Sequence, residues 1–399
     1  MRNRSRKLAV LASIAAIATV VGLAAPAGAG PTVLTGTKNS LGEAGSDTTY
    51  WMMQLIAPQY NVNTGNNVDG DYVTEIPPLN NAPFPAGTFV PADDVAGSTL
   101  WDSSSAPVTP PNGSSAGIAA LDADTTGAID FARSSRGPNT GETSTKNFWA
   151  YGLGALDYVT FPGTHAPPAG LTQQTLINIY TCHTSGPNVG KPNIPDWHQI
   201  NANAPVGSTI VKYLPQTSSG TYSFFKSKLL NGNTPDAGCD ASHQSTFLEE
   251  HDARGVTTAS KPNAIYAFDW SRWRAQGTGI EANLRNGSTL GKLGTTTNPD
   301  NRQLPSTTTV NTTPSRFLGT RYVFNVVEKA SHPSGYTNQL ADVQKLIGVL
   351  PSGSGGAGFI CAGSAATAIS LAGFVPLPLS GSGGVGLPQS HCKLNPPAL

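Results

Sequence analysis

Three short segments rich in glycine and hydroxyl residues each precede a stretch with helical periodicity. They read GSDTT at 45–49, GSSAG at 113–117 and SSGT at 218–221. A hydroxyl residue at such a position caps the free N–H groups of a first helical turn. The same N–H groups, with a close-approaching glycine and the helix dipole, also favour an anion. Each segment alone predicts an N-cap, whereas three of them at one edge of a sheet predict an anion-binding site.

Apolar strands alternate with helices along the chain, which predicts an α/β architecture with largely parallel pairing. The predicted strands are rich in β-branched and aromatic residues and lie at 127–135, 151–161, 208–215, 263–270 and 321–327. The predicted helices follow the three polar segments and also cover 172–182, with Thr172 as N-cap, and 337–350. The 44 glycines and 32 prolines predict long loops, among them an irregular insertion at 64–111 with one short strand.

The N-terminus has the pattern of a secretory signal peptide at 1–29. Basic residues within 2–7 precede an apolar run at 8–21, and an A-x-A cleavage site follows at 27–29. The apolar run is short for a membrane span, and no cysteine stands at the cleavage site to carry a lipid anchor. We therefore expect a secreted, extracellular chain that starts at Gly30 and has no stable membrane insertion.

Charge and cysteine content narrow the functional classes. Charged residues make up 12% of the chain and 24 basic residues balance 24 acidic ones, so we expect no nucleic-acid surface.

Four cysteines in an exported chain predict two disulfides, for which three pairings are open. We favour Cys182–Cys239 and Cys361–Cys392, because each pair closes a local loop. Without C-x-x-C or close Cys/His spacing, neither a metal nor a cofactor is expected.

Six segments in a fixed order span most of the mature chain. They are GSDTT, GSSAG, IDFARSS, LTQQTLINIYTC with IPDWHQI, SSGTYSFF and the terminal GFVPLP. This set resembles the extracytoplasmic phosphate-binding proteins of ABC transporters, which belong to the periplasmic-binding-protein class. The resemblance implies a two-lobed fold of type II, with mixed, mainly parallel sheets and a ligand cleft between the lobes.

The same resemblance implies the domain organisation and the mode of action. Lobe 1 would comprise 30–150 and the returning segment 320–399, and lobe 2 would comprise 151–319. The two lobes would clamp phosphate or a related oxyanion by hinge closure, with no bond chemistry and no catalytic residue. The implied partner is an ABC permease, and we expect a monomer.

The polar segments and the resemblance together supply the expected ligand-binding residues, which are Ser46, Thr48, Ser114, Ser115, Ser135, Arg136, Ser219, Gly220 and Thr221. Two positions depart from the family pattern. Ser135 stands where the family has an aspartate that accepts the proton of hydrogen phosphate, and Pro215 stands where it has an arginine. Arg133 and Arg136 lie on opposite strand faces, and we prefer Arg136, at the turn, as the ligand contact. Phosphate and sulfate both stay open as ligands.

Two other functions stay open. One is a secreted surface or interaction protein that uses the same fold and the insertion at 64–111 for a partner other than a permease. The other is a serine hydrolase, because GSSAG also spells the G-x-S-x-G nucleophile motif around Ser115. The preceding SSSAPVTPPN is a poor strand and no later histidine stands out, so we expect no enzyme.

The seven histidines are scattered without paired metal spacing. The run EEHD at 249–252 could attract a cation, but charge runs are more often solvated. We therefore interpret it as an exposed helix face.

Overall fold

The computed structural model describes residues 40–63, 71–74, 100–101, 107–108, 111, 113–124, 129–182, 193–295, 301–311, 316–329, 339–348, 358–377, 391–396 and 398–399. The predicted signal peptide at 1–29 and most of the predicted insertion at 64–111 lie outside these residues. Within the insertion, the described elements are the strands β2 (Asp71–Thr74), β3 (Leu100–Trp101) and β4 (Pro107–Val108).

One sheet of 11 strands organises the described chain, with the main order β2-β1-β5-β13-β6-β10-β8-β9. The strands β11, β14 and β15 pair with β6 outside this path, and β7 pairs with β12 in a separate small sheet. The bounds are β1 Ser40–Gly45, β5 Phe131–Ser134, β6 Lys146–Thr160, β7 Leu171–Thr172, β8 Val211–Pro215, β9 Thr246–Leu248, β10 Ala264–Asp269, β11 Thr289–Leu290, β12 Leu293–Gly294, β13 Thr320–Glu328, β14 Val375–Pro376 and β15 Lys393–Leu394.

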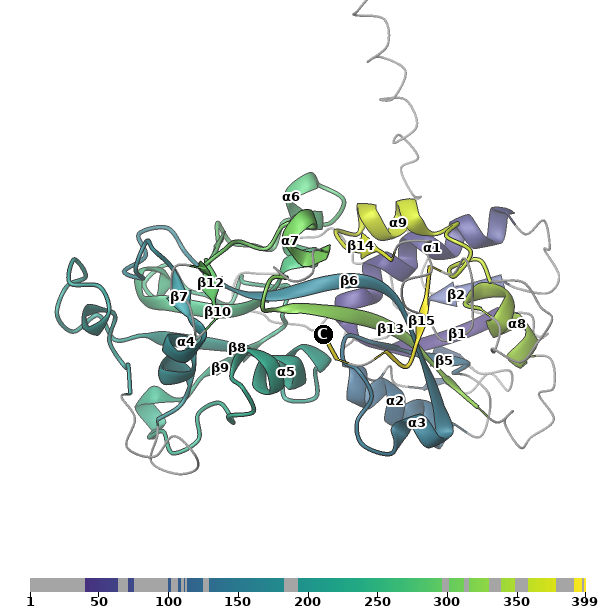
Figure 1. The fold of residues 1–399 in the computed structure, drawn as a ribbon, viewed down its shortest axis with the longest axis horizontal. Helices are drawn as coiled ribbons and strands as arrows, with labels where there is room; N and C mark the ends of the chain where they lie inside the picture. Colours follow the sequence, from purple (N-terminus) through teal and green to yellow (C-terminus); the bar gives the residue numbers. More distant parts are fainter. Residues whose placement is uncertain are drawn as a thin grey trace, which may run out of the picture. The chain divides into compact units, whose positions relative to one another are not determined.

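Strand β6 joins two halves of this sheet. Its residues from Lys146 to Ala155 pair with β13, and those from Leu156 to Val159 pair with β10. Figure 1 shows β6 and β13 running side by side through the sheet. All 15 residues of β6 are buried, and for this reason the strand is almost continuously apolar from Phe148 onward instead of alternating.

The pairing is more antiparallel than strand–helix alternation predicts. β1 pairs in parallel with β2 and β5, and β8 pairs in parallel with β9 and β10. In contrast, β13, β10, β11, β14 and β15 all run against β6. The α/β class and the mixed sheet are confirmed, but parallel pairing dominates only at the two ends of the strand order. The reason is that the long central strands β6 and β13 carry the chain in opposite directions.

Helical structure begins within the predicted polar segments. GSDTT contains a 3₁₀ turn, η1 (Asp47–Thr49), and α1 (Tyr50–Asn63) follows it, while α2 (Ser114–Ala123) and α5 (Gly220–Phe224) start in the other two segments. Thr172 caps the next helix as predicted, since its Oγ1 accepts a hydrogen bond from the Thr175 N–H at 3.1 Å. The remaining helices are α3 (Glu142–Thr145), α4 (Gln173–Tyr180), α6 (Trp270–Thr278), α7 (Thr307–Asn311), α8 (Gln339–Leu346) and α9 (Ala366–Leu371). No helix among the described residues has both the length and the apolar character needed to cross a membrane.

Apolar packing holds α1 against the sheet and so positions the segment before it. Met52, Met53 and Ile56 of α1 pack with Phe131 of β5 and Trp149 of β6. Each of these side chains is almost fully buried, and such burial stabilises the fold by about 1.5–3 kcal/mol per residue. As a result, η1 is fixed beside the end of β1.

Two disulfides close loops in the described chain. Cys182 is joined to Cys239 and Cys361 is joined to Cys392, which are the same sequential pairs that the sequence favours. The pairs span sequence separations of 57 and 31 residues. No described cysteine is free.

Replacing both Cys361 and Cys392 by serine should lower the free energy of unfolding by about 3–4 kcal/mol, because the unfolded chain loses its loop constraint. Urea unfolding of the wild type and the double variant measures this loss. The Cys182/Cys239 double variant should lose slightly more, since its loop is longer. A wild-type unfolding curve that does not change when reductant is added would contradict the prediction.

Candidate functional site

The three polar segments meet in one buried cluster of hydroxyl groups. Thr48 Oγ1 lies 3.1 Å from Thr221 Oγ1, and Ser114 Oγ lies 3.2 Å from Ser135 Oγ. The Ser135 N–H also donates to Ser114 Oγ at 2.9 Å. Together with Ser219, these residues form what we call the hydroxyl cluster, and all five are buried. The structure therefore brings together side chains from η1, the start of α2, the end of β5 and the start of α5.

The close approach of these segments requires a glycine at position 220. A Cβ atom added to Gly220 would lie 2.2 Å from Ser114 Oγ and 2.7 Å from Ser135 Oγ. Both distances are far inside van der Waals contact. Gly113, at φ 94°, has a similar role, because an added Cβ would lie 2.7 Å from the Ser218 carbonyl oxygen. The glycines of the polar segments thus allow the three backbones to meet.

The carboxylate of Glu250 lies at the centre of the donors. Its Oε1 accepts hydrogen bonds from Thr48 Oγ1 and, at 2.8 Å, from Thr221 Oγ1. Its Oε2 accepts one from Ser219 Oγ at 3.0 Å. Glu250 is fully buried. Hydroxyl groups from two distant parts of the chain therefore surround one carboxyl group, in the arrangement that the sequence predicts around an external oxyanion.

Arg321 of β13 is a member of the site that sequence analysis missed. Its Nη2 donates to Thr221 Oγ1 at 2.9 Å and to Asp269 Oδ2 at 2.7 Å, and its Nη1 donates to the Ser135 carbonyl oxygen at 3.2 Å. The sequence signal for this residue is an arginine near the start of an otherwise apolar strand. An arginine that is buried in such a strand requires polar partners, so its presence could have predicted a polar site at this end of the strand.

The remaining predicted residues lie beside the cluster. Arg136 pairs with both Glu142 oxygens at 2.8 Å, and its Nε donates to Ser115 Oγ at 3.0 Å. Arg133, on the other strand face, donates to Glu43 Oε1 at 3.0 Å. The Ser46 side chain is buried, and its Oγ has no hydrogen-bond partner among the described residues.

A pocket of about 450 Å³ adjoins the cluster. It is lined by two members of the site, Ser135 and Arg321, and by the cationic side chains of Arg136 and Lys228. Its apolar wall includes Phe224, Tyr322, Phe324, Pro396 and Leu399. A solute in this pocket would lie beside three cationic side chains, those of Arg136, Lys228 and Arg321, and beside a ring surface.

The run at 249–252 is buried, and our interpretation of it as a solvated helix face is wrong. Glu249, Glu250, His251 and Asp252 follow β9 in a turn and are between 0% and 4% exposed. Backbone contacts hold the run in place, since the Asp269 N–H donates to the Glu250 carbonyl oxygen at 2.8 Å and Tyr266 Oη donates to that of Glu249. Tertiary packing of β9 and β10 against the rest of the sheet, which the local sequence does not encode, buries these charges.

Burial shifts the ionisation of this run. The pKa of Glu250 is raised to about 8, chiefly by burial and secondly by the negative charge of Asp47. The pKa of His251 is lowered, chiefly by burial and then by the positive charge of Arg272, and both effects favour the neutral imidazole. These shifts reduce the number of uncompensated charges inside the protein.

Three buried or partly buried arginines balance neighbouring carboxylates. Arg272 pairs with Glu281 at 2.7 Å, Arg321 with Asp269 at 2.7 Å and Arg254 with Asp252 at 2.5 Å. The first pair also supports η1, because Arg272 Nη1 donates to the Asp47 carbonyl oxygen at 2.6 Å. Burial raises the pKa of Glu281 to about 7 even though Arg272 opposes the shift.

The surroundings of Ser115 do not match a nucleophile elbow. Such an elbow is a tight turn from a strand into a helix, whereas Pro111 and Gly113, ahead of α2, lie in no strand. Ser115 Oγ accepts a hydrogen bond from the guanidinium of Arg136, which has donors but no acceptor atom and so cannot act as a general base. The geometry therefore does not favour the hydrolase hypothesis.

Gly220→Ala should destabilise the protein by about 1–3 kcal/mol, because the new methyl group would overlap two serine hydroxyls. The matched control is Gly137→Ala, where the nearest atom to an added Cβ is 3.8 Å away. The control should be neutral or slightly stabilising, since alanine restricts the unfolded chain. Thermal and urea unfolding of both variants check the difference, and equal stabilities would contradict the close approach.

Glu281→Gln should remove one pH-dependent contribution to stability. The pKa of Glu281 is about 7 in the folded chain and 4.5 without the fold, so the folded state binds the proton more tightly. Its contribution is complete below pH 4.5 and is lost as the pH rises through about 7, with a total of about 3 kcal/mol. Urea unfolding between pH 4.5 and 8 should therefore show that the wild type loses stability relative to Glu281→Gln. Parallel curves would contradict the assignment.

Comparisons with known proteins agree with this architecture. A family model described as a PBP superfamily domain matches residues 102–343, more than half of the chain. A search of curated proteins finds no match.

Several solved structures are similar to this chain at low identity. An ABC-type phosphate transport receptor from Vibrio cholerae is 15% identical with a TM-score of 0.49, over 85% of this chain and 100% of that one. PstS from Borrelia burgdorferi is 15% identical with a TM-score of 0.44, over 86% and 100%. The periplasmic molybdate-binding protein of Azotobacter vinelandii is 10% identical with a TM-score of 0.34, over 85% and 99%. The family match, which covers most of the sheet and the polar segments at 113–117 and 218–221, shows that the chain belongs to the PBP superfamily.

Proposed function

We propose that this protein is a secreted solute-binding protein that captures phosphate or a related oxyanion for an ABC uptake system. The observation that carries the proposal is the convergence of the Thr48, Ser219 and Thr221 hydroxyls on the two oxygens of one carboxyl group, that of Glu250. Carboxyl and phosphate oxygens both accept hydrogen bonds from hydroxyl groups, and these bonds are stronger when the acceptor is ionised. The site is thus already arranged for an oxyanion.

In this proposal, the side chain of Glu250 occupies the solute-binding position when no solute is bound. An incoming oxyanion replaces the Glu250 carboxylate and accepts the hydroxyl hydrogen bonds of the cluster. Arg321 supplies positive charge at the same point, because its Nη2 already contacts Thr221 Oγ1. Release of the oxyanion returns the hydroxyls to Glu250, so the buried donors have an acceptor in both states.

The pocket next to the cluster supports the proposal. Its walls include Ser135 and Arg321, so a solute in the pocket lies directly beside the hydroxyl cluster. Its volume of about 450 Å³ is within the usual range for small-ligand sites and exceeds the needs of an inorganic anion. Phosphate, sulfate and a small organic phosphate are therefore all included in the proposed solute class.

Ser135 bears on the choice among these anions. A serine hydroxyl can donate to a fully ionised oxyanion, whereas the carboxylate expected at this position from the family would repel one. We therefore infer a weaker preference for hydrogen phosphate over sulfate than the family pattern implies. The ordered motifs at 45–49, 113–117 and 218–221 and the predicted signal peptide at 1–29 support export and delivery to a permease.

Calorimetric titration of the anion-free protein with phosphate and with sulfate tests the proposal. The wild type should bind at least one of the two anions with micromolar affinity or tighter, about 8 kcal/mol. Above pH 8, where the Glu250 carboxyl group is ionised, Glu250→Gln should strengthen binding, because it removes the competing negative charge. Thr221→Val should weaken it about 10-fold or more, because a charge-assisted hydrogen bond is lost.

Thr145→Val is the matched control, since Thr145 is an exposed threonine of α3 outside the cluster. It should leave the affinity unchanged. An absence of heat for both anions in the wild type and in Glu250→Gln would refute oxyanion capture. Equal effects of Thr145→Val and Thr221→Val would remove the hydroxyl cluster as the binding site.

A further inference from the structure

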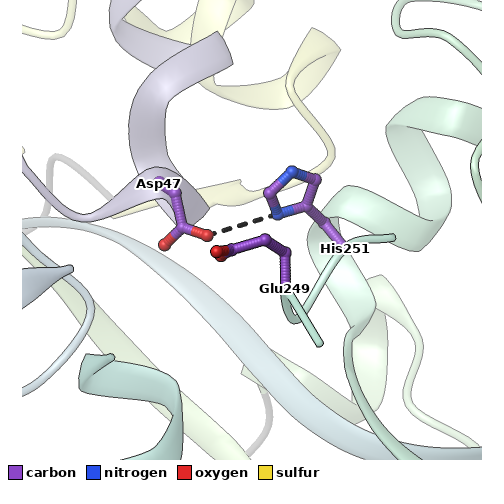
Figure 2. Close-up of side chains that lie close together, drawn as sticks. All are labelled: Asp47, Glu249 and His251. Carbon is purple, nitrogen blue, oxygen red and sulfur yellow. Dashed lines mark ion pairs between the residues drawn. The ribbon is translucent and has the colours of Figure 1, made fainter. Parts of the chain in front are cut away.

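Asp47, Glu249 and His251 bring three metal-binding side chains to one buried point. Their ligand atoms all lie within 4.8 Å of one another. Figure 2 shows the three side chains pointing toward one another, with Asp47 reaching in from the segment ahead of α1. Glu249 and His251 come from the turn after β9, on the opposite side of the point. We call these three residues the acid–histidine site.

Two potential metal-ligand atoms of the acid–histidine site, one from Asp47 and one from His251, face each other without a hydrogen bond. Asp47 Oδ2 and His251 Nδ1 are 3.4 Å apart, and neither has a hydrogen-bond partner in the described part of the chain. Both residues are only 2% exposed. Buried polar atoms normally have a hydrogen-bond partner. Two facing atoms that both lack such a partner therefore point to a ligand that binds to both of them.

The spacing of these atoms suits a tetrahedral metal ion. With metal–ligand bonds of 2.0–2.2 Å, neighbouring ligand atoms of a tetrahedral zinc ion lie about 3.4 Å apart. The distance between Asp47 Oδ2 and His251 Nδ1 is 3.4 Å. A cation placed between these two atoms would satisfy both of them.

Neighbouring groups hold the donors in orientation. The Thr48 N–H donates to Asp47 Oδ1 at 3.0 Å, which directs Oδ2 toward His251. Gln216 Nε2 donates to Glu249 Oε1 at 2.7 Å. Partners of this kind orient ligands in known metal sites and raise metal affinity. Gln216 is therefore a positioning residue of the site.

We propose that Asp47, Glu249 and His251 bind a Zn²⁺ ion. One imidazole and two carboxylates form a ligand set that zinc accepts readily, whereas Mg²⁺ and Ca²⁺ prefer oxygen ligands alone. The two carboxylates balance the charge of a divalent cation in a buried place. Three protein ligands leave a fourth position for water or another oxygen. This site is distinct from the hydroxyl cluster, although Glu250 lies between Glu249 and His251 in the chain.

Titration of the full chain with Zn²⁺ alone, after treatment with a chelator and dialysis, tests the proposal. The wild type should bind one Zn²⁺ per chain with micromolar affinity or tighter, and Mg²⁺ and Ca²⁺ should give no binding at the same concentrations. The described cysteines are all in disulfides and do not compete as ligands.

Variants then locate the site. Loss of an outer-shell partner already costs about 10–100-fold in affinity, so His251→Ala and Asp47→Asn should each weaken Zn²⁺ binding about 100-fold or more. Gln216→Ala should weaken it about 10-fold. His243→Ala is the matched control, because it removes a partly exposed histidine that is paired with Asp240 and lies outside the site, and it should leave the affinity unchanged.

Two further measurements keep the test decisive if a variant folds poorly. Zn²⁺ should raise the Tm of the wild type and of His243→Ala, but not that of Asp47→Asn, the most conservative change. Co²⁺ bound to the wild type should show the intense visible absorption of tetrahedral coordination. An absence of Zn²⁺ binding by the wild type, or an unchanged affinity in both His251→Ala and Asp47→Asn, would overturn the proposal.

Discussion

The buried carboxylate of Glu250 and the hydroxyls that surround it form the interaction on which the site depends. Burying a carboxylate costs several kcal/mol unless hydrogen bonds replace its hydration. Thr48, Ser219 and Thr221 supply those hydrogen bonds from segments that lie far apart in the chain. Because the same donors suit an oxyanion solute, the contact that closes the site is also the one that a ligand would replace. When the solute binds or leaves, the hydroxyl donors exchange one acceptor for the other, either the Glu250 carboxyl group or the oxyanion.

Arginines that pair with neighbouring carboxylates offset part of the free-energy cost of burying several acidic side chains in this region. Arg321 reaches from β13 to Asp269 at the end of β10, and Arg272 of α6 reaches both Glu281 and the backbone of Asp47. Each guanidinium offers several donors in a fixed plane and so can join three segments at once. These contacts hold η1 and the turn after β9 in register, which places Asp47 opposite His251. The hydroxyl cluster and the acid–histidine site therefore share one supporting network.

Local sequence chemistry predicted the beginnings of the helices but not which side chain accepts the hydrogen bonds at the centre of the hydroxyl cluster. Thr172 caps α4 and Ser219 caps α5, because a side chain and a backbone N–H a few residues apart meet whenever a helix forms there. The contacts of Glu250 with Thr48 and of Arg321 with Thr221 span 202 and 100 residues. A run of charged residues reads as a solvated surface when only its neighbours in sequence are known. Nothing within a few residues of Glu250 shows that β9 and β10 bury it.

By itself, the sequence determined the α/β class, the two sequential cysteine pairs that close local loops, and the glycine and hydroxyl residues at three helix starts. These features follow from turn chemistry, capping and hydrophobic periodicity, all of which act over a few residues. Tertiary structure decided the antiparallel pairing along β6, the burial of the run at 249–252 and the entry of Arg321 into the site. Each of these three features depends on which distant strands become neighbours. The desolvation of a charged side chain is likewise set by the whole surrounding fold and not by the residues next to it in sequence.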